Sequence, residues 1–171
     1  KETVESIKDC DIVISTGGVS MGEHDYVKKF FEEKNSIVFG RVNMKPGLPT
    51  MFAKYNDILF FGLSGNPVSC VVGYYCFVKT LLSHYFKNDC INNKYVKSKI
   101  LHDINSSSER TELVRAKTYF YNNELISEIT GKNQLSSSLI SLKDFNSFII
   151  IDCKSQKRNQ IIDVIIVEDI I

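Results

Sequence analysis

The sequence lacks the features that mark several common classes of protein. Its five cysteines are scattered and no two of them form a C-x-x-C pair, which argues against a disulfide framework and against a zinc site. No apolar run is long enough to span a bilayer, and residues 1–25 contain neither the apolar core of a signal peptide nor the bias of a transit peptide. We therefore expect a cytoplasmic protein that does not insert into a membrane, with reduced and mostly buried thiols.

An excess of one charge is also missing. Lys+Arg 21 against Asp+Glu 20 leaves a formal net charge of +1, so no overall field attracts nucleic acid. The phosphate-loop pattern ending in G-K-[ST] and the dinucleotide pattern G-x-G-x-x-G are both absent. A hydrophobic content of 43% in 171 residues is enough for a real core. The composition indicates a globular protein in which any anion site is local.

One stretch, Asp11–Phe30, organises the first half of the chain. Residues 12–14 are apolar and β-branched, which predicts a buried strand of the parallel type. Residues 15–18 follow as a loop whose two glycines let the backbone bend and approach a ligand. Asp25 is placed to cap a helix with apolar residues at helical spacing. Strand, glycine loop and helix in this order favour a ligand at the carboxyl end of the strand.

Three more strands are predicted before the middle of the chain. Ile37–Val42 predicts a strand that ends in the loop Asn43–Pro49, which contains two prolines and one glycine. Thr50–Lys54 and Ile58–Leu63 predict a hairpin around a turn-forming triplet. We expect these strands to belong to the same sheet as the strand at residues 12–14.

A second glycine loop leads into a long helix. It reads Ser64-Gly65-Asn66-Pro67, with asparagine in the N-cap position and proline at the favoured first helical position. The apolar stretch from Val68 to about Phe86 is predicted to be a buried helix. Its first N–H groups are expected to face the cleft.

The second half predicts an all-β domain, a small barrel or sandwich. Polar residues 87–94 form the candidate boundary, which divides the chain into residues 1–88 and 95–171. Short β-branched and aromatic runs alternate with Asn, Ser, Gly and Lys clusters. The predicted strands are Tyr95–His102, Thr111–Tyr121, Leu125–Ile129, Phe148–Asp152 and Ile161–Val167.

The three loops of the first half predict one anion-binding cleft. Since each loop follows a strand of an open α/β sheet, we expect them to meet along one edge. Backbone donors together with Arg41 and Lys45 suit an oxyanion or a phosphate. Glu23 and Asp25 supply the oxygen ligands that Mg²⁺ prefers when it also binds a substrate phosphate. The hydroxyls expected at this cleft belong to Thr16, Ser20, Ser64 and Ser69.

Simpler interpretations stay open for each of these residues. The first glycine pair fits a plain tight turn, Asp25 fits an ordinary N-cap, and the two cations fit ordinary surface charges. In the second half, Glu109, Arg110 and Arg115 are interpreted as a solvated face.

Three motifs in one order and spacing carry a family resemblance. They read G-G-V-S-M-G-E-H-D-Y-V-K, G-R-V-N-M-K-P-G-L-P-T and S-G-N-P-V-S. Together they resemble the molybdenum-insertion enzymes of molybdenum cofactor synthesis, closest to the E domain of gephyrin. The match continues at Arg110-Thr111-Glu112 and at Thr130–Ser137, which is similar to the family's T-G-N-Q-x-S-S segment. The resemblance implies the last portion of a three-layer, mostly parallel molybdopterin-binding α/β domain, incomplete at the N-terminus, followed by a β-barrel-like domain.

The resemblance also implies an activity and a set of site residues. Such enzymes insert molybdate into adenylylated molybdopterin and release AMP in the presence of Mg²⁺, as homodimers. Asp25, Arg41 and Lys45 would be catalytic, and Glu23 and Asp25 would bind the metal. The residues that would hold the pterin or phosphate groups, or shape the loop above them, are Thr16, Gly17, Gly18, Ser20, Pro46, Gly47, Ser64, Gly65, Asn66, Pro67 and Ser69.

Two departures from the family pattern matter. Ser64 stands where the family has the proline of L-P-G-N-P. The family's upstream acidic T-G-[DN]-E segment is absent, so we expect a segment of a longer polypeptide that holds only part of the site. The alternative function is a gephyrin-like scaffold that clusters receptors without catalysis. Residues 149–154 lack the proline-bearing loop associated with receptor binding in gephyrin. We therefore expect this chain not to bind a receptor.

Overall fold

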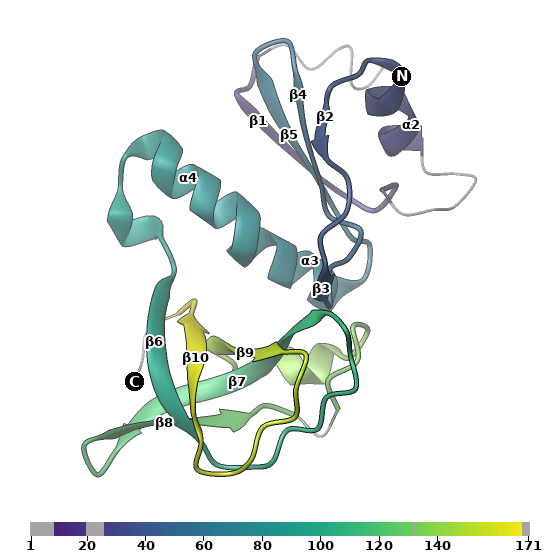
Figure 1. Cartoon of the computed structure of the whole chain (residues 1–171). Helices are drawn as coiled ribbons and strands as arrows, with labels where there is room; N and C mark the ends of the chain where they lie inside the picture. Colours follow the sequence, from purple (N-terminus) through teal and green to yellow (C-terminus); the bar gives the residue numbers. More distant parts are fainter. Residues whose placement is uncertain (1–8, 20–25, 132, 169–171) are drawn as a thin grey trace.

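The structure, a computed structural model, describes residues 9–19, 26–131 and 133–168. Figure 1 shows a sheet with flanking helices above, a small barrel below, and a long helix between them. The first sheet contains, in spatial order, β1 (Ile12–Thr16), β5 (Ile58–Leu63), β4 (Met51–Tyr55) and β2 (Ile37–Phe39).

Strand direction in this sheet brings three loops to one edge. β1 is parallel to β5, and β4 is antiparallel to both β5 and β2. The strands β1, β5 and β2 therefore run in one direction and β4 runs against them, so the described sheet is mixed, with β1–β5 as its parallel pair. β4 is reversed because it forms the predicted hairpin with β5, with Asn56 of the turn at a φ of 52°. β2 is shorter than predicted and ends at Phe39, next to an irregularity in its register with β4.

Helices cover both faces of the sheet and give three layers. Helix α2 (Tyr26–Glu33) buries Phe30 and Phe31 against one face, where Phe60 also points. The next residue, Phe61, points to the opposite face and packs with Val78 of the long helix, as alternation along a strand requires. The predicted three-layer arrangement is confirmed.

The long helix is continuous but changes type in its middle. α3 (Pro67–Gly73) passes into the π-helical turn η1 (Tyr74–Val78) and then into α4 (Lys79–Phe86). It begins as predicted, with Asn66 as N-cap residue and proline in the first turn. The π turn was not predicted. The Tyr75 carbonyl in this turn accepts a hydrogen bond of 2.6 Å from Nδ2 of Asn93. The segment just before β6 therefore supplies a hydrogen-bond donor to the π turn.

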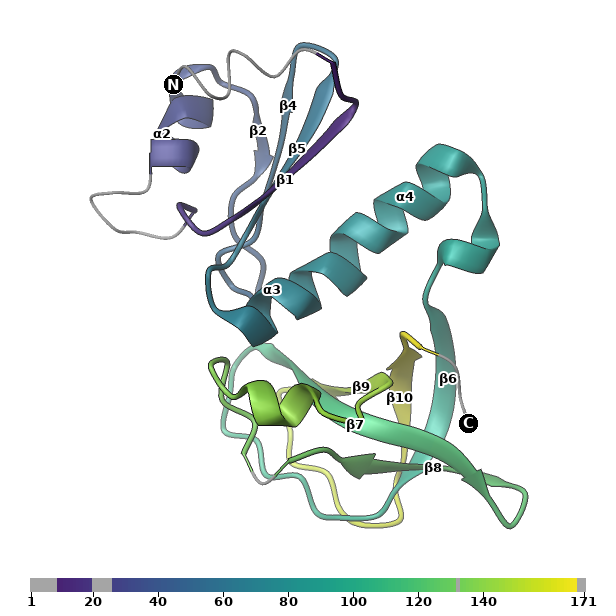
Figure 2. The ribbon, with the colours of Figure 1, turned by 180° about the vertical axis from the view of Figure 1, so that it is seen from behind.

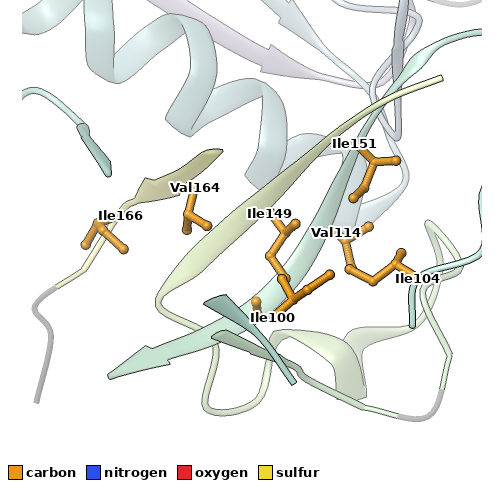
Figure 3. Close-up of a cluster of buried hydrophobic side chains, with 8 residues drawn as sticks. Ile100, Ile104, Val114, Ile149, Ile151, Val164 and Ile166 are labelled. Carbon is orange, nitrogen blue, oxygen red and sulfur yellow. The ribbon is translucent and has the colours of Figure 1, made fainter. Parts of the chain in front are cut away.

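The second half forms a closed barrel. Neighbouring strands follow the order β7-β8-β6-β10-β9, and β9 returns to β7. Its interior contains an aliphatic cluster, which Figure 3 shows around Ile149 and Val114, and a group of hydrogen-bonded hydroxyls that includes Thr118 and Ser127. All five strands predicted in this half are present. The elements are η2 (Asp89–Ile91), β6 (Lys94–Ile100), β7 (Thr111–Tyr121), β8 (Glu124–Ile129), η3 (Leu139–Leu142), β9 (Ser147–Asp152) and β10 (Ile161–Ile166).

The two halves share a hydrophobic core at their junction. The short strand β3 (Met44–Lys45) leaves the first half and pairs in parallel with the start of β7. Met44, Val72 of α3 and Phe148 of β9 belong to one buried cluster. Because this cluster draws on both halves, the position of the barrel is fixed relative to the long helix.

The cysteines correct one expectation. All five are free, but Cys10, Cys90 and Cys153 are exposed, and Cys70 and Cys76 are half-buried. Cys153 lies at a bend, Cys10 lies between two bends, and Cys90 lies in the short helix η2, which buries none of its residues. Burial raises the pKa of Cys76 to about 12, so its thiol stays protonated at neutral pH. No helix in the described ranges is both long and apolar enough to cross a membrane.

The shared cluster makes a quantitative prediction. Replacing Phe148, which is fully buried, with alanine is expected to lower the free energy of unfolding by about 3–5 kcal/mol. Urea denaturation of Phe148→Ala measures this loss. Phe120→Ala is the matched control, because Phe120 is 66% exposed and its loss leaves no cavity. Equal losses in the two variants would contradict the proposed role of the junction core.

Candidate functional site

Two glycine loops touch at the carboxyl ends of β1 and β5. The backbone N–H of Gly17 donates a 2.8 Å hydrogen bond to the carbonyl of Leu63. A Cβ added to Gly65 would lie 3.6 Å from the Cα of Gly17, at ordinary van der Waals distance, so the two loops pass close to each other. Gly17 and Gly18 have φ angles of 85° and 72°, a region that side chains disfavour. The predicted meeting of these two loops is confirmed.

Ser64 replaces the family's proline with a hydrogen bond. Its buried side-chain oxygen accepts from the backbone N–H of Asn66 at 3.3 Å. A hydroxyl can close a turn in this way. The departure from the family pattern therefore leaves an ordered turn at the start of α3.

The barrel reaches the same loop through Ser136. The backbone N–H of Val68 donates to the Ser136 carbonyl at 3.3 Å, and Asn66 Nδ2 donates to the Ser136 hydroxyl at 3.4 Å. Figure 2 shows the segment with η3 beside the start of α3. The expectation that the first helical N–H groups face a cleft is thus wrong for Val68, because the barrel occupies its N–H.

The third loop lies against the start of α3. Pro46 and Gly47 are buried, and Gly47 has a φ of 108°. The hydroxyl of Thr50 donates to the Gly47 carbonyl at 2.7 Å. A Cβ on Gly47 would lie 3.7 Å from the carbonyl oxygen of Ser69 and only 2.4 Å from the methyl carbon of Met44. Glycine is therefore required where this loop passes the helix, and Ser69 itself is buried.

The cations of the third loop are accessible. Lys45 is 48% exposed, and its ammonium lies 3.4 Å from a carboxylate oxygen of Glu112 on β7. The other oxygen of Glu112 accepts a 2.7 Å hydrogen bond from the Ser106 hydroxyl, so the carboxylate is held in place. Arg41 is also exposed. The β3–β7 pairing positions Lys45 beside the barrel.

Part of the predicted site lies outside the described residues. This applies to Ser20, Glu23 and Asp25, so their roles stay predictions. Thr16 is described and exposed at the end of β1. The described ranges contain no group of three His, Cys, Asp or Glu side chains that could hold a metal ion.

The sequence analysis missed the barrel's side of the site. Glu112 and Ser136 stand within quoted motifs but were assigned no role. The contact of Ser136 with Asn66 joins positions 70 residues apart, and spacing along the chain does not reveal such a pair. Arg115 corrects a prediction: it is 1% exposed, not part of a solvated face, and burial lowers its pKa to about 10.

Comparison with known proteins identifies the first half. Residues 1–84 match the family described as probable molybdopterin binding domain. Over this stretch, just under half of the chain, the sequence is similar to that family. The chain is also 36% identical to the molybdopterin molybdenumtransferase of Bacillus subtilis strain 168, over 148 residues that cover 86% of this chain and 34% of the relative. It is 36% identical to the molybdenum cofactor synthesis protein cinnamon of Drosophila melanogaster, over 91% of this chain and 26% of the relative.

A solved structure supports the same family assignment. The crystal structure of the molybdopterin biosynthesis moeA protein from Pyrococcus horikoshii OT3 matches with a TM-score of 0.70 and 27% identity, covering 96% of this chain and 38% of that chain. The resemblance to molybdenum-insertion enzymes and the two-part fold are thereby confirmed. The chain spans only about a quarter to two fifths of the length of these family members.

The left-handed glycine at the loop contact yields a testable prediction. Gly17→Ala is expected to destabilise the protein by about 1–2 kcal/mol, because a side chain at positive φ is strained. Gly65→Ala is the control, since its Cβ would meet Gly17 only at ordinary contact distance. Thermal unfolding of both variants measures the difference. A loss for Gly65→Ala as large as that for Gly17→Ala would contradict this account.

Proposed function

We propose that this chain forms the pterin-holding part of a molybdopterin molybdenumtransferase, an enzyme of molybdenum cofactor biosynthesis. The observation that carries the proposal is the close approach of the Gly17 and Gly65 loops at the ends of two parallel strands. Backbone without Cβ atoms allows a flat ring or a phosphate to approach closely. Similarity to the molybdopterin-binding family in the same stretch supports the pterin as that ligand.

The proposed reaction inserts molybdate into adenylylated molybdopterin and releases AMP. Both the metal oxyanion and the phosphate are anions, and Lys45 is an accessible cation next to Pro46 and Gly47 of the third loop. Lys45 is 48% exposed in its pair with Glu112, and that carboxylate also keeps its hydrogen bond from Ser106. The ammonium can therefore turn to a substrate oxyanion at low cost. Catalysis then consists of positioning and charge stabilisation, with no covalent protein nucleophile.

The remaining roles extend this proposal. Arg41 binds molybdate or phosphate beside Lys45, and Glu23 and Asp25 bind Mg²⁺ at the phosphate. We assign no step to the metal. The other residues proposed to contact the pterin or phosphate are Thr16, Gly17, Gly18, Ser20, Pro46, Gly47, Ser64, Gly65, Asn66, Pro67 and Ser69.

The proposal includes the setting of the enzyme. We propose a cytoplasmic homodimer in which this chain is part of a longer polypeptide, with a domain boundary between residues 88 and 95. The short share of each relative that the chain covers supports the longer polypeptide.

The test is AMP release by the natural protein that carries this chain. Lys45→Ala is expected to lower AMP release from adenylylated molybdopterin with molybdate about ten- to one-hundred-fold, because a hydrogen bond to a charged group contributes about 1.5–3 kcal/mol. The assay is run anaerobically with Mg²⁺, and thermal unfolding is measured alongside.

Lys54→Ala is the matched control, because Lys54 is an exposed lysine on the reversed strand β4. It is expected to leave AMP release unchanged. Equal release by wild type and Lys45→Ala would count against Lys45 as an anion-binding residue. No release by the wild-type protein would overturn the proposed function.

A further inference from the structure

A buried arginine in the barrel holds the segment that contacts the glycine loop. On β7, Val114 and Ala116 point into the barrel interior, whereas Leu113 points outward into the junction core. Alternation along the strand places Arg115 and Lys117 on the same outward face as Leu113. Lys117 is exposed but Arg115 is not. Something outside the barrel therefore covers Arg115.

The cover is the segment 133–141. Arg115 Nε donates to the Ser141 hydroxyl at 3.1 Å, and Nη2 donates to the Leu135 carbonyl at 3.2 Å. The backbone of Arg115 is bound as well, since its N–H donates to the Gln134 side chain at 2.9 Å. One residue thus engages the segment at its beginning and at its end.

This segment also has hydrogen bonds to nearby residues, since Gln134 Nε2 donates to the Thr130 carbonyl at 2.7 Å and the Ser141 hydroxyl donates to the Ser138 carbonyl at 2.6 Å. Most of it is irregular, with only η3 at its end, so no strand ladder holds it. The hydroxyl of Thr130 donates to the Ser141 carbonyl at 2.7 Å, which closes the ends of the loop. The middle of the loop presents Ser136, whose two contacts reach Asn66 and Val68. The arginine therefore lies at the base of a loop whose tip touches the candidate site.

The guanidinium of Arg115 binds the segment rather than a strand of the barrel. Its hydrogen bonds to Ser141 and Leu135 go to neutral oxygens, and removing a charge from water is costly unless it is compensated. An apolar side chain of similar volume is often tolerated at such a position. The arginine's contacts therefore favour a role in ordering the segment.

We propose that Arg115 is a positioning residue for the substrate site, holding the segment 133–141 so that Ser136 fixes the start of α3. This inference rests on the proposed function where it concerns substrate, but the positioning itself does not. The N–H of Val68 is one of the first in α3 and has no partner within the helix. Its protection from hydrogen exchange therefore reports the position of Ser136 directly.

The first experiment follows amide hydrogen exchange by NMR in Arg115→Met and Arg115→Lys. Both variants are expected to accelerate exchange at Val68 about two- to tenfold, the range that corresponds to one hydrogen bond. Lysine keeps the charge but lacks the planar guanidinium fork whose Nε and Nη2 reach Ser141 and Leu135 at once, so it is expected not to restore protection. Ser141→Ala removes the acceptor of Nε, together with the hydroxyl's own hydrogen bond to the Ser138 carbonyl, and is expected to accelerate exchange at Val68 less than the arginine variants do.

Thr118→Val is the matched control. Thr118 is a buried residue of the same strand that bonds to the hydroxyls of Ser127 and Ser147 inside the barrel. It is expected to lower barrel stability without accelerating exchange at Val68. Unchanged exchange at Val68 in the arginine variants and in Ser141→Ala overturns the positioning role. Acceleration by Thr118→Val to the same degree also overturns it.

A kinetic measurement separates this inference from the proposed function. In the natural protein, Arg115→Met is expected to raise the KM for adenylylated molybdopterin more than it lowers kcat, since the loop's position is changed and no reacting group is lost. Faster exchange at Val68 with unchanged KM overturns the link to substrate. If the wild-type protein releases no AMP, the proposed function fails, and the exchange data still decide whether Arg115 positions the loop.

Discussion

The parallel pairing of β1 with β5 is the constraint on which the site depends. It aligns Thr16 with Leu63, so the two glycine loops leave the sheet side by side and Gly17 bonds to the Leu63 carbonyl. A shift of one residue in this register would exchange the two faces of the shifted strand and so change the side chains that each helix layer meets. The aromatic layers on the two faces of β5, formed around Phe60 and Phe61, resist such a shift.

The long helix connects this sheet edge with the barrel. It begins at the second glycine loop, packs on the sheet through Val78, and contributes Val72 to the core that it shares with Phe148 of β9. Its π turn receives Asn93 from the segment that leads into β6. The barrel is therefore held against the helix near Val72 and again at the π turn. Its segment 133–141 consequently lies against the glycine loop that contains Asn66.

Electrostatics at the site follow from this arrangement. The accessible cations Arg41 and Lys45 come from one loop, and the barrel supplies the carboxylate of Glu112 to the second of them. Arg115 is the contrasting case, because its charge is buried and satisfied by neutral oxygens. Lys45 is thus available to a ligand, while the charge of Arg115 serves the fold.

The sequence by itself determined the local elements and the family. Asn66 and Pro67 marked the start of the helix, glycines marked the loops, and β-branched runs marked the barrel strands, because these signals depend on neighbouring residues only. Three ordered motifs were enough to indicate the molybdopterin-binding family. The tertiary structure alone decided that Arg115 is buried, that Val68 donates to Ser136, and that Lys45 pairs with Glu112. Those contacts join residues far apart in the chain, and their formation depends on how the barrel packs against the helix, which no local pattern encodes.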